Sequence, residues 1–85
     1  MKRLIVRIEL VNARENDYSV LETELGQRGF SLSERTARIA QYIFAGEGTL
    51  ETVAKLAQQS AMKTAKRFFI FVSDPNEDKG LGIAG

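Results

Sequence analysis

The spacing of the hydrophobic residues changes back and forth along this chain, and the order of the changes constrains the fold more than any other feature. Near the N-terminus, apolar residues occupy every second position, which is the spacing of a strand with one buried face. The same alternation returns near the C-terminus, at Phe68, Ile70 and Val72. Two stretches between them have apolar residues three or four positions apart, which is typical of amphipathic helices. The pattern therefore predicts strands and helices alternating within one short chain.

The first half of the sequence predicts a strand and then a helix. The strand, residues 2–11, has one apolar face made by Leu4, Val6, Ile8 and Leu10. Its other face carries Arg3, Ile5, Arg7 and Glu9. After a turn at residues 12–16, Asn16 or Asp17 is suited to cap the helix by accepting a bond from a free backbone N–H. The helix has Tyr18, Leu21 and Leu25 on one face, and Gly29 is suited to stop it.

Residues 30–45 fit two interpretations. As strands, Phe30 and Leu32 alternate first, and residues 39–44 then alternate between two faces. As a helix, Ser33 caps the segment and Gly46 ends it, which would allow a helix-turn-helix DNA binder with a helix over 36–45. The β-branched and aromatic content of residues 39–44 favours the strand.

The rest of the chain predicts a second helix and a last strand. Thr49 caps the helix, whose buried stripe is Leu50, Val53, Ala57 and Ala61. Pro75 ends the strand at Asp74. Residues 1–74 are therefore expected to form one α+β domain of ferredoxin-like β-α-β-β-α-β order, a four-stranded antiparallel sheet with two helices on one face. Residues 75–85, with three glycines, are expected to be a tail that is mobile or ordered against a partner.

Composition excludes several chemistries. With no cysteine, the chain has no disulfide-linked partner and no thiolate metal site. With no histidine, it has no imidazole catalysis and no conventional zinc site, so a metal would be oxygen-bound Mg²⁺ or Mn²⁺. No secretory segment or membrane-length apolar run is present, and a cytoplasmic protein is expected. The net charge of +1 permits nucleic acid as a partner without demanding it.

Glu9 is the best candidate for a catalytic residue, because it lies near the end of the first strand, where a sheet can present a carboxylate to a metal or phosphate. The simpler interpretation is an exposed glutamate paired with Arg7 or with a basic neighbouring strand. Asp74 is more simply the start of a turn at Pro75.

The sheet face opposite the helices is the second candidate site. Ile5, Phe69 and Phe71 are expected there, between Arg3 and Arg7, and Tyr42 and Phe44 could join them. Aromatic residues among arginines suit the stacking of RNA bases, but so apolar a face also suits a homodimer or partner interface, which we favour over direct stacking. A basic corner that includes Lys66 and Arg67 could position a phosphate backbone.

Several segments resemble the small ferredoxin-like family that includes the GhoS-type antitoxins. The matching segments are residues 4–10, Asp17 and Tyr18 three residues before Leu21, and residues 29–31, 40–42 and 72–74. Lys63, Thr64, Lys66 and Phe68 also match. The resemblance implies an antitoxin that acts as an endoribonuclease on a toxin's messenger RNA, with a fold shared by small CRISPR-adaptation nucleases. Glu9 falls near the carboxylate that those nucleases place after their first strand, with glutamate in place of aspartate.

We therefore expect a cytoplasmic homodimer with an RNA-directed role. In this hypothesis Glu9 assists a metal or a water molecule, and the phosphates are held by Arg3, Arg7, Lys66 and Arg67. No cofactor and no metal-ligand set are assigned, and Mg²⁺ enters only if the protein cuts RNA. The alternative is a non-enzymatic module that binds protein or a second copy through Ile5, Phe69 and Phe71.

Overall fold

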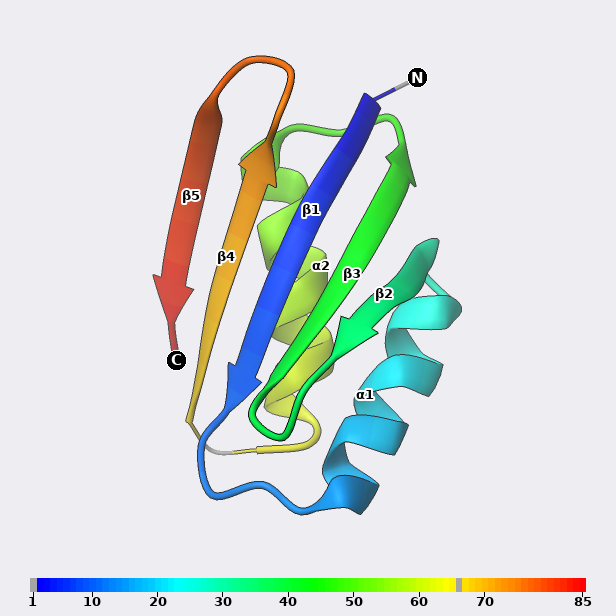
Figure 1. The fold of residues 1–85 in the computed structure, drawn as a ribbon, viewed down its shortest axis with the longest axis vertical. Coiled ribbons are helices and arrows are strands. Elements are labelled where there is room, and N and C mark those ends of the chain that lie inside the picture. Colours follow the sequence, from blue (N-terminus) through cyan, green and yellow to red (C-terminus); the bar gives the residue numbers. More distant parts are fainter. Residues whose placement is uncertain (1, 66) are drawn as a thin grey trace.

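The computed structural model describes residues 2–65 and 67–85, and it has the α+β class that the sequence predicts. Figure 1 shows the arrangement of its two helices and five strands. The elements in chain order are β1 (Lys2–Leu10), α1 (Glu15–Gly26), β2 (Phe30–Arg35), β3 (Ile39–Gly46), α2 (Leu50–Met62), β4 (Phe68–Asp74) and β5 (Lys79–Ala84). Residues 30–35 and 39–46 are strands, so the helix-turn-helix interpretation is wrong.

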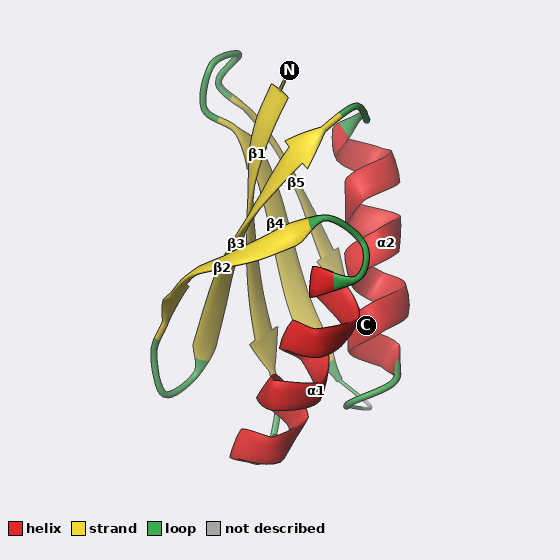
Figure 2. Cartoon of the chain, turned by 90° about the vertical axis from the view of Figure 1, so that its right-hand side faces the viewer, coloured by secondary structure: helices red, strands yellow, loops and turns green. Residues whose placement is uncertain are grey.

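The strands form one antiparallel sheet in the order β2-β3-β1-β4-β5, with β1 at its centre. Ile8 of β1 lies opposite Ala40 of β3 on one side and Ile70 of β4 on the other. Directly opposed residues share a face of the sheet, so these pairings fix which side chains meet the helices. Both helices cover the same face, and within the described part of the chain the other face carries no helix (Figure 2).

The core lies between this face and the helices. Val6, Ile8, Leu21, Leu25 and Val53 are fully buried, as the spacing predicts. Burial alternates along β1 and β4, so both strands present one apolar face inward.

Tyr42 and Phe44 lie on the helix side, so the prediction that they could join the opposite face is wrong. Tyr42 pairs with Val6, and Phe44 pairs with Leu4 and packs on Phe30 with ring centroids 4.9 Å apart. Residues 39–44 have large apolar side chains on both faces, so the pairing with β1 decides which face is buried.

Local hydrogen bonds stabilise the first turn of each helix. Thr49 caps α2 as expected, because its Oγ1 accepts a bond of 3.1 Å from the Thr52 N–H. Helix α1 begins earlier than expected, with Arg14 at the cap position in place of Asn16 or Asp17. Asp17 still takes part, since its carboxylate accepts a bond of 2.9 Å from the Arg14 N–H and thereby satisfies a backbone group at the helix start.

The prediction of four strands is wrong, because residues expected to form a mobile or partner-ordered tail form β5 in the same chain. Asp74 is buried and its Oδ1 accepts a bond of 3.0 Å from the Asn76 N–H, which starts the turn from β4 into β5. All six residues of β5 pair with β4 without a break. Gly85 extends the ladder, exchanging bonds of 3.1 and 2.9 Å with Phe68.

Candidate functional site

The face of the sheet without helices, called here the open face, brings together residues from three central strands. On its middle row, Arg7 of β1 lies between Gln41 of β3 and Phe71 of β4. On the next row, Glu9 lies between Ile39 and Phe69. The described open-face residues of these strands also include Arg3, Ile5, Ile43 and Ser73. These three strands thus contribute two aromatic rings, two arginines and one carboxylate, with aliphatic side chains, to the open face. Glu34 of β2, opposite Gln41, adds a second carboxylate beside them.

Phe69 and Phe71 are the large apolar residues most exposed on this face, at 48% and 47%. They are two positions apart on β4, so their Cα atoms are about 7 Å apart and their side chains point the same way. The ring of Phe71 extends over β5, because a Cβ added at Gly80 would lie 2.5 Å from its Cζ. A side chain at position 80 would therefore displace the ring, and glycine leaves room for it.

A shallow hollow of about 520 Å³ lies beside these rings. Its walls include Arg7 and Glu9 from β1, Ile39 from β3, the two phenylalanines, and residues 82–84 of β5. Most of the wall is apolar, with one cation and one anion among the described residues that line it. Such a surface can hold a flat apolar group against the phenylalanines, while Arg7 donates hydrogen bonds and Glu9 accepts them.

The structure brings some of the predicted site residues together and separates others. Glu9, Arg7, Phe69 and Phe71 share the hollow, and Ile5 lies one row away between Ile43 and Ser73.

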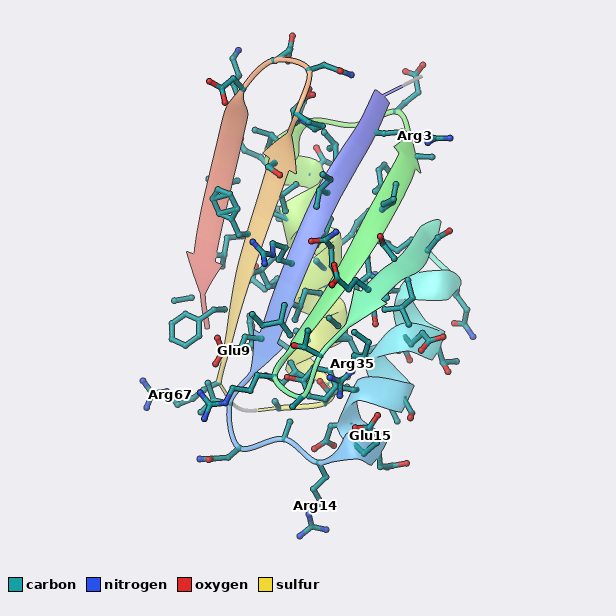
Figure 3. The ribbon with its side chains drawn as sticks, in the orientation of Figure 1. Arg3, Glu9, Arg14, Glu15, Arg35 and Arg67 are labelled. Carbon is teal, nitrogen blue, oxygen red and sulfur yellow. The ribbon has the colours of Figure 1, made fainter. Side chains whose placement is uncertain are left out.

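Two predicted phosphate-holding arginines lie outside the hollow, toward the ends of the sheet. Figure 3 shows Arg3 near one end of β1, and Arg67 beyond the other end, not far from Glu9. Arg67 directly precedes β4, and its carbonyl oxygen accepts a bond of 3.0 Å from the Val11 N–H. Both side chains are exposed. Lys66 lies outside the described residues.

Sequence reasoning missed the parts of the site that come from β3 and β5. Gln41 and Ile39 alternate with the buried Ala40 and Tyr42, and this alternation becomes informative once the register with β1 is known. The β5 wall was missed because the glycine-containing tail was not expected to form a strand. The signal for that strand is the alternation of Leu81 and Ile83 after a turn.

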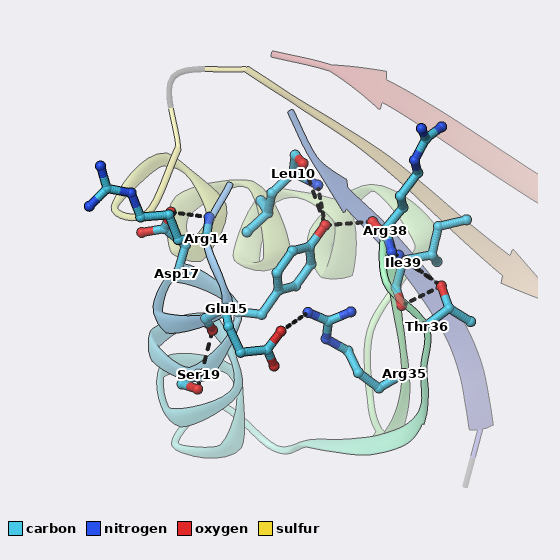
Figure 4. A network of polar contacts seen from close by, with 10 residues as sticks. Leu10, Arg14, Glu15, Asp17, Ser19, Arg35, Thr36, Arg38 and Ile39 are labelled. Carbon is cyan, nitrogen blue, oxygen red and sulfur yellow. Dashed lines mark hydrogen bonds and ion pairs between the residues drawn. The ribbon is translucent and has the colours of Figure 1, made fainter. Parts of the chain in front are cut away.

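Other cations are engaged on the helix side of the molecule. Arg35 lies 3.1 Å from the Glu15 carboxylate, and its guanidinium carbon is 3.7 Å from the Tyr18 ring centre (Figure 4). Lys63 lies 3.2 Å from the carboxylate of Glu24. These contacts help to hold the helices and loops, so the open-face arginines are the better candidates for binding an anionic partner.

The Tyr18 hydroxyl joins three segments beside this ion pair. It accepts a bond of 3.0 Å from the Leu10 N–H at the end of β1 and donates to the Arg38 carbonyl oxygen in the β2–β3 turn. The Thr36 side chain closes that turn by accepting a bond of 3.1 Å from the Ile39 N–H (Figure 4). This network holds the turn that leads into the Ile39 wall of the hollow.

The hydroxyl of Tyr42 has a shifted pKa, and it lies on the helix side of the sheet, away from the hollow. Burial, and secondarily the negative charge of Glu22, raises the pKa of the Tyr42 hydroxyl to about 12. Over residues 2–65 and 67–85, no group of three or more acidic side chains is arranged to hold a metal ion. Glu9 therefore has no carboxylate cluster around it within that part of the chain.

Comparisons with known proteins leave the chain without an identified family. No protein-family model, no curated protein and no solved structure matches it. The resemblance to the GhoS-type family stays a prediction. No helix within the described part of the chain is long and apolar enough to cross a membrane. Fold and site define the protein as a small α+β domain whose antiparallel sheet keeps one face open.

Proposed function

We propose that this protein binds single-stranded RNA on the open face of a ferredoxin-like domain with an added fifth strand. The ferredoxin-like part of the proposal is supported by the order β2-β3-β1-β4 and by the two helices on one face. The observation that carries the RNA part is the pair of half-exposed phenylalanines, Phe69 and Phe71, beside Arg7 in the hollow.

Aromatic rings on a sheet bind single strands because every base has an apolar face that can stack on them. Phe69 and Phe71 point the same way from alternate positions of one strand, a spacing that suits two successive unstacked bases. Arg7, directly opposite Phe71, can bind a phosphate or a base edge, and Gln41 next to it can donate and accept hydrogen bonds.

The two outer arginines extend this site along the strand direction. From Arg3 to the end of β1 the chain runs about 23 Å, and Arg67 lies near the far end. A stretched single strand of about four nucleotides, the short end of the range for single-strand-binding folds, fits this length. Duplex RNA fits it poorly, because its bases are already stacked and paired.

We propose that the protein binds RNA without cutting it. Among the described residues that line the hollow, Glu9 is the acidic one, and a nuclease that places a metal or a water molecule generally uses more than one polar ligand. The GhoS-type resemblance implies cleavage, so the binding experiment carries a cleavage arm with Mg²⁺ and with a chelator.

The test measures binding of a short fluorescent single-stranded RNA by anisotropy. We expect Phe69→Ala and Phe71→Ala each to weaken binding about 5- to 150-fold, the range for losing one stacked base. The matched control is Val20→Ala, which trims an apolar side chain of 40% exposure on α1, and it should leave the affinity unchanged. A duplex of the same sequence should bind more weakly. Absence of RNA affinity in the wild type at low salt would overturn the proposal.

The cleavage arm decides whether binding alone describes the protein. We expect the RNA to stay intact with and without Mg²⁺. Cleavage that needs Mg²⁺ and falls at least about 100-fold in Glu9→Gln would make Glu9 a catalytic residue and the protein a nuclease.

A second candidate function uses the same face for a protein partner, the use that its apolar composition alone favours. The half-exposed phenylalanines beside Arg7 in the hollow are the reason that RNA is proposed first. The half-buried Ile5, Ile39 and Ile43 continue the apolar surface of the phenylalanines across the sheet, and such surfaces are commonly covered. If the face is a protein interface, Phe69→Asp should abolish an association that occurs without RNA. If it is an RNA site, the same change should remove RNA affinity and leave the oligomeric state unaltered.

A further inference from the structure

The two outer strands of the sheet differ in how well they are protected against pairing with another chain. Strand β2 is irregular, with a shift of register between Leu32 and Glu34, and it ends in the charged Glu34 and Arg35. Irregularities and charges of this kind keep an edge from adding a further strand. Strand β5 has an unbroken register with β4, and its one charged residue, Lys79, lies at its beginning. The β5 edge therefore has little protection.

The hydrogen bonds of the last residue pair show which groups of β5 point outward. Gly85 and Phe68 exchange both of their backbone bonds, at 3.1 and 2.9 Å. In an antiparallel ladder such pairs alternate with pairs whose N–H and C=O groups point away from each other. Gly80, Gly82 and Ala84 are the residues of the second kind, so their backbone donors and acceptors face away from β4 along the free edge.

The side chains of β5 leave this edge accessible. Gly80, Gly82 and Ala84 are exposed and have no side chain beyond a methyl group. Leu81 and Ile83 point to the opposite face, where they are half-buried and pack on the core. A second strand could thus approach the edge without a steric obstacle and meet an apolar strip on the helix side.

We propose that β5 pairs antiparallel with β5 of a second copy of this chain, about a two-fold axis at Gly82. In this register Gly82 lies opposite Gly82 of the second copy, and Gly80 lies opposite Ala84. These three pairs satisfy all six of the outward-facing backbone groups on each copy. The two sheets become one continuous sheet of ten strands, twice the five of one chain.

A second copy fits this edge because the pairing is self-complementary. On the helix side, Leu81 meets Ile83 of the other copy, so apolar residues oppose apolar residues. The two Lys79 residues lie at opposite ends of the pairing, roughly 20 Å apart, and their repulsion is screened at physiological ionic strength. The centre is glycine against glycine, which removes side-chain conflict at the symmetry axis.

This pairing rests on the β5 edge and does not depend on the RNA site. It would place two open faces side by side, because residues 82–84 form the outer wall of each hollow. One RNA could then contact both copies, and the paired sites would bind a longer strand more tightly than either site alone.

The test uses sedimentation velocity without RNA at tens of micromolar, where we expect the wild type to be a dimer. Position 82 can accept a side chain in one copy, since a Cβ there meets its nearest atoms at 3.9 Å. Gly82→Glu and Gly82→Lys each place two like charges opposite each other at the axis, and each should weaken dimerisation about tenfold or more. Gly82→Ala is the uncharged control and should remain a dimer.

Mixing the two charged variants tests the register itself. Gly82→Glu and Gly82→Lys together should form a heterodimer, because opposite charges then face each other across the axis. A wild type that is monomeric throughout this concentration range would overturn the proposal. A dimer that tolerates both charges, or a mixture that stays monomeric, would overturn it as well.

Amide exchange keeps the proposal testable if a charged variant unfolds. In the wild type, the outward amides of Gly80, Gly82 and Ala84 should exchange more slowly as the protein concentration rises. No change in their exchange would contradict pairing at this edge. A wild type that forms the dimer but does not bind RNA would contradict the proposed function and leave the β5 pairing intact.

Discussion

Single residues on β1 separate the two faces of the sheet. Val6 and Ile8 are fully inaccessible to solvent, whereas Arg7 between them is exposed on the open face. A slip of one residue in the pairing of β1 would bury Arg7 and expose its apolar neighbours. The same alternation that forms the core therefore also places Arg7 in the hollow.

Tyr42 gives a prediction at the residue scale. Its pKa is about 12 in the folded protein, against 10.0 for an ordinary tyrosine, mainly because it is buried. The unfolded chain therefore loses this proton at lower pH than the folded one, so the free energy of unfolding keeps its full value below pH 10 and falls as the pH rises toward 12. The loss from this group should be about 2–3 kcal/mol.

The measurement compares urea unfolding of the wild type and of Tyr42→Phe from neutral pH to pH 12. Above pH 10, the unfolding free energy of the wild type should fall relative to that of Tyr42→Phe, because phenylalanine has no proton to lose. A difference that stays constant over this range would show that burial does not shift the hydroxyl.

The start of α2 gives a prediction at the scale of a secondary-structure element. Thr49→Ala removes the side-chain acceptor of the Thr52 N–H and should lower the free energy of unfolding by about 1 kcal/mol. Thr23→Ala, at an exposed position inside α1, is the matched control and should have little effect because alanine favours helix. Equal effects of the two changes in urea unfolding would mean that Thr49 is not an effective cap.

Elements with strong periodicity could be predicted from the sequence, and elements formed by long-range pairing could not. Leu21, Leu25 and Val53 lie buried where helical spacing places them. Strand β5 was missed because glycine has low strand propensity, while its stability comes from pairing with β4 and from packing of Leu81 and Ile83.

The candidate site was partly predictable for the same reason. Arg7, Phe69 and Phe71 share the open face, as alternation on two strands predicts. Glu9 lies beside them only because β1 pairs with β4, which the alternation alone does not specify. The position of Gln41 beside Arg7 and the inward position of Tyr42 depend on the register of β3 against β1. A single sequence does not specify that register.

The distribution of charge over the whole molecule gives a prediction for RNA binding. The net charge is only +1, so attraction must come from local cations on the open face. If Arg3, Arg7 and Arg67 each contact a phosphate, the logarithm of the affinity should fall with the logarithm of the salt concentration with a slope of about −2. Arg7→Ala should weaken binding and reduce this slope by about 0.7.

Lys55→Ala is the control for the salt experiment, because Lys55 is exposed on α2, on the covered side of the sheet. It removes the same charge from the total and should leave the slope unchanged. Equal changes of slope in Arg7→Ala and Lys55→Ala would indicate attraction by net charge and no phosphate contact at Arg7.

The central position of β1 has a consequence for the synthesis of the chain. This strand is made first, but its neighbours β3 and β4 are completed only at residues 46 and 74. At ordinary translation rates, Leu4, Val6 and Ile8 therefore wait roughly 3 to 13 s for both flanking strands. During that interval the nascent protein displays an apolar strand with two unpaired edges, which is the form most readily bound by chaperones or captured by another unfinished copy.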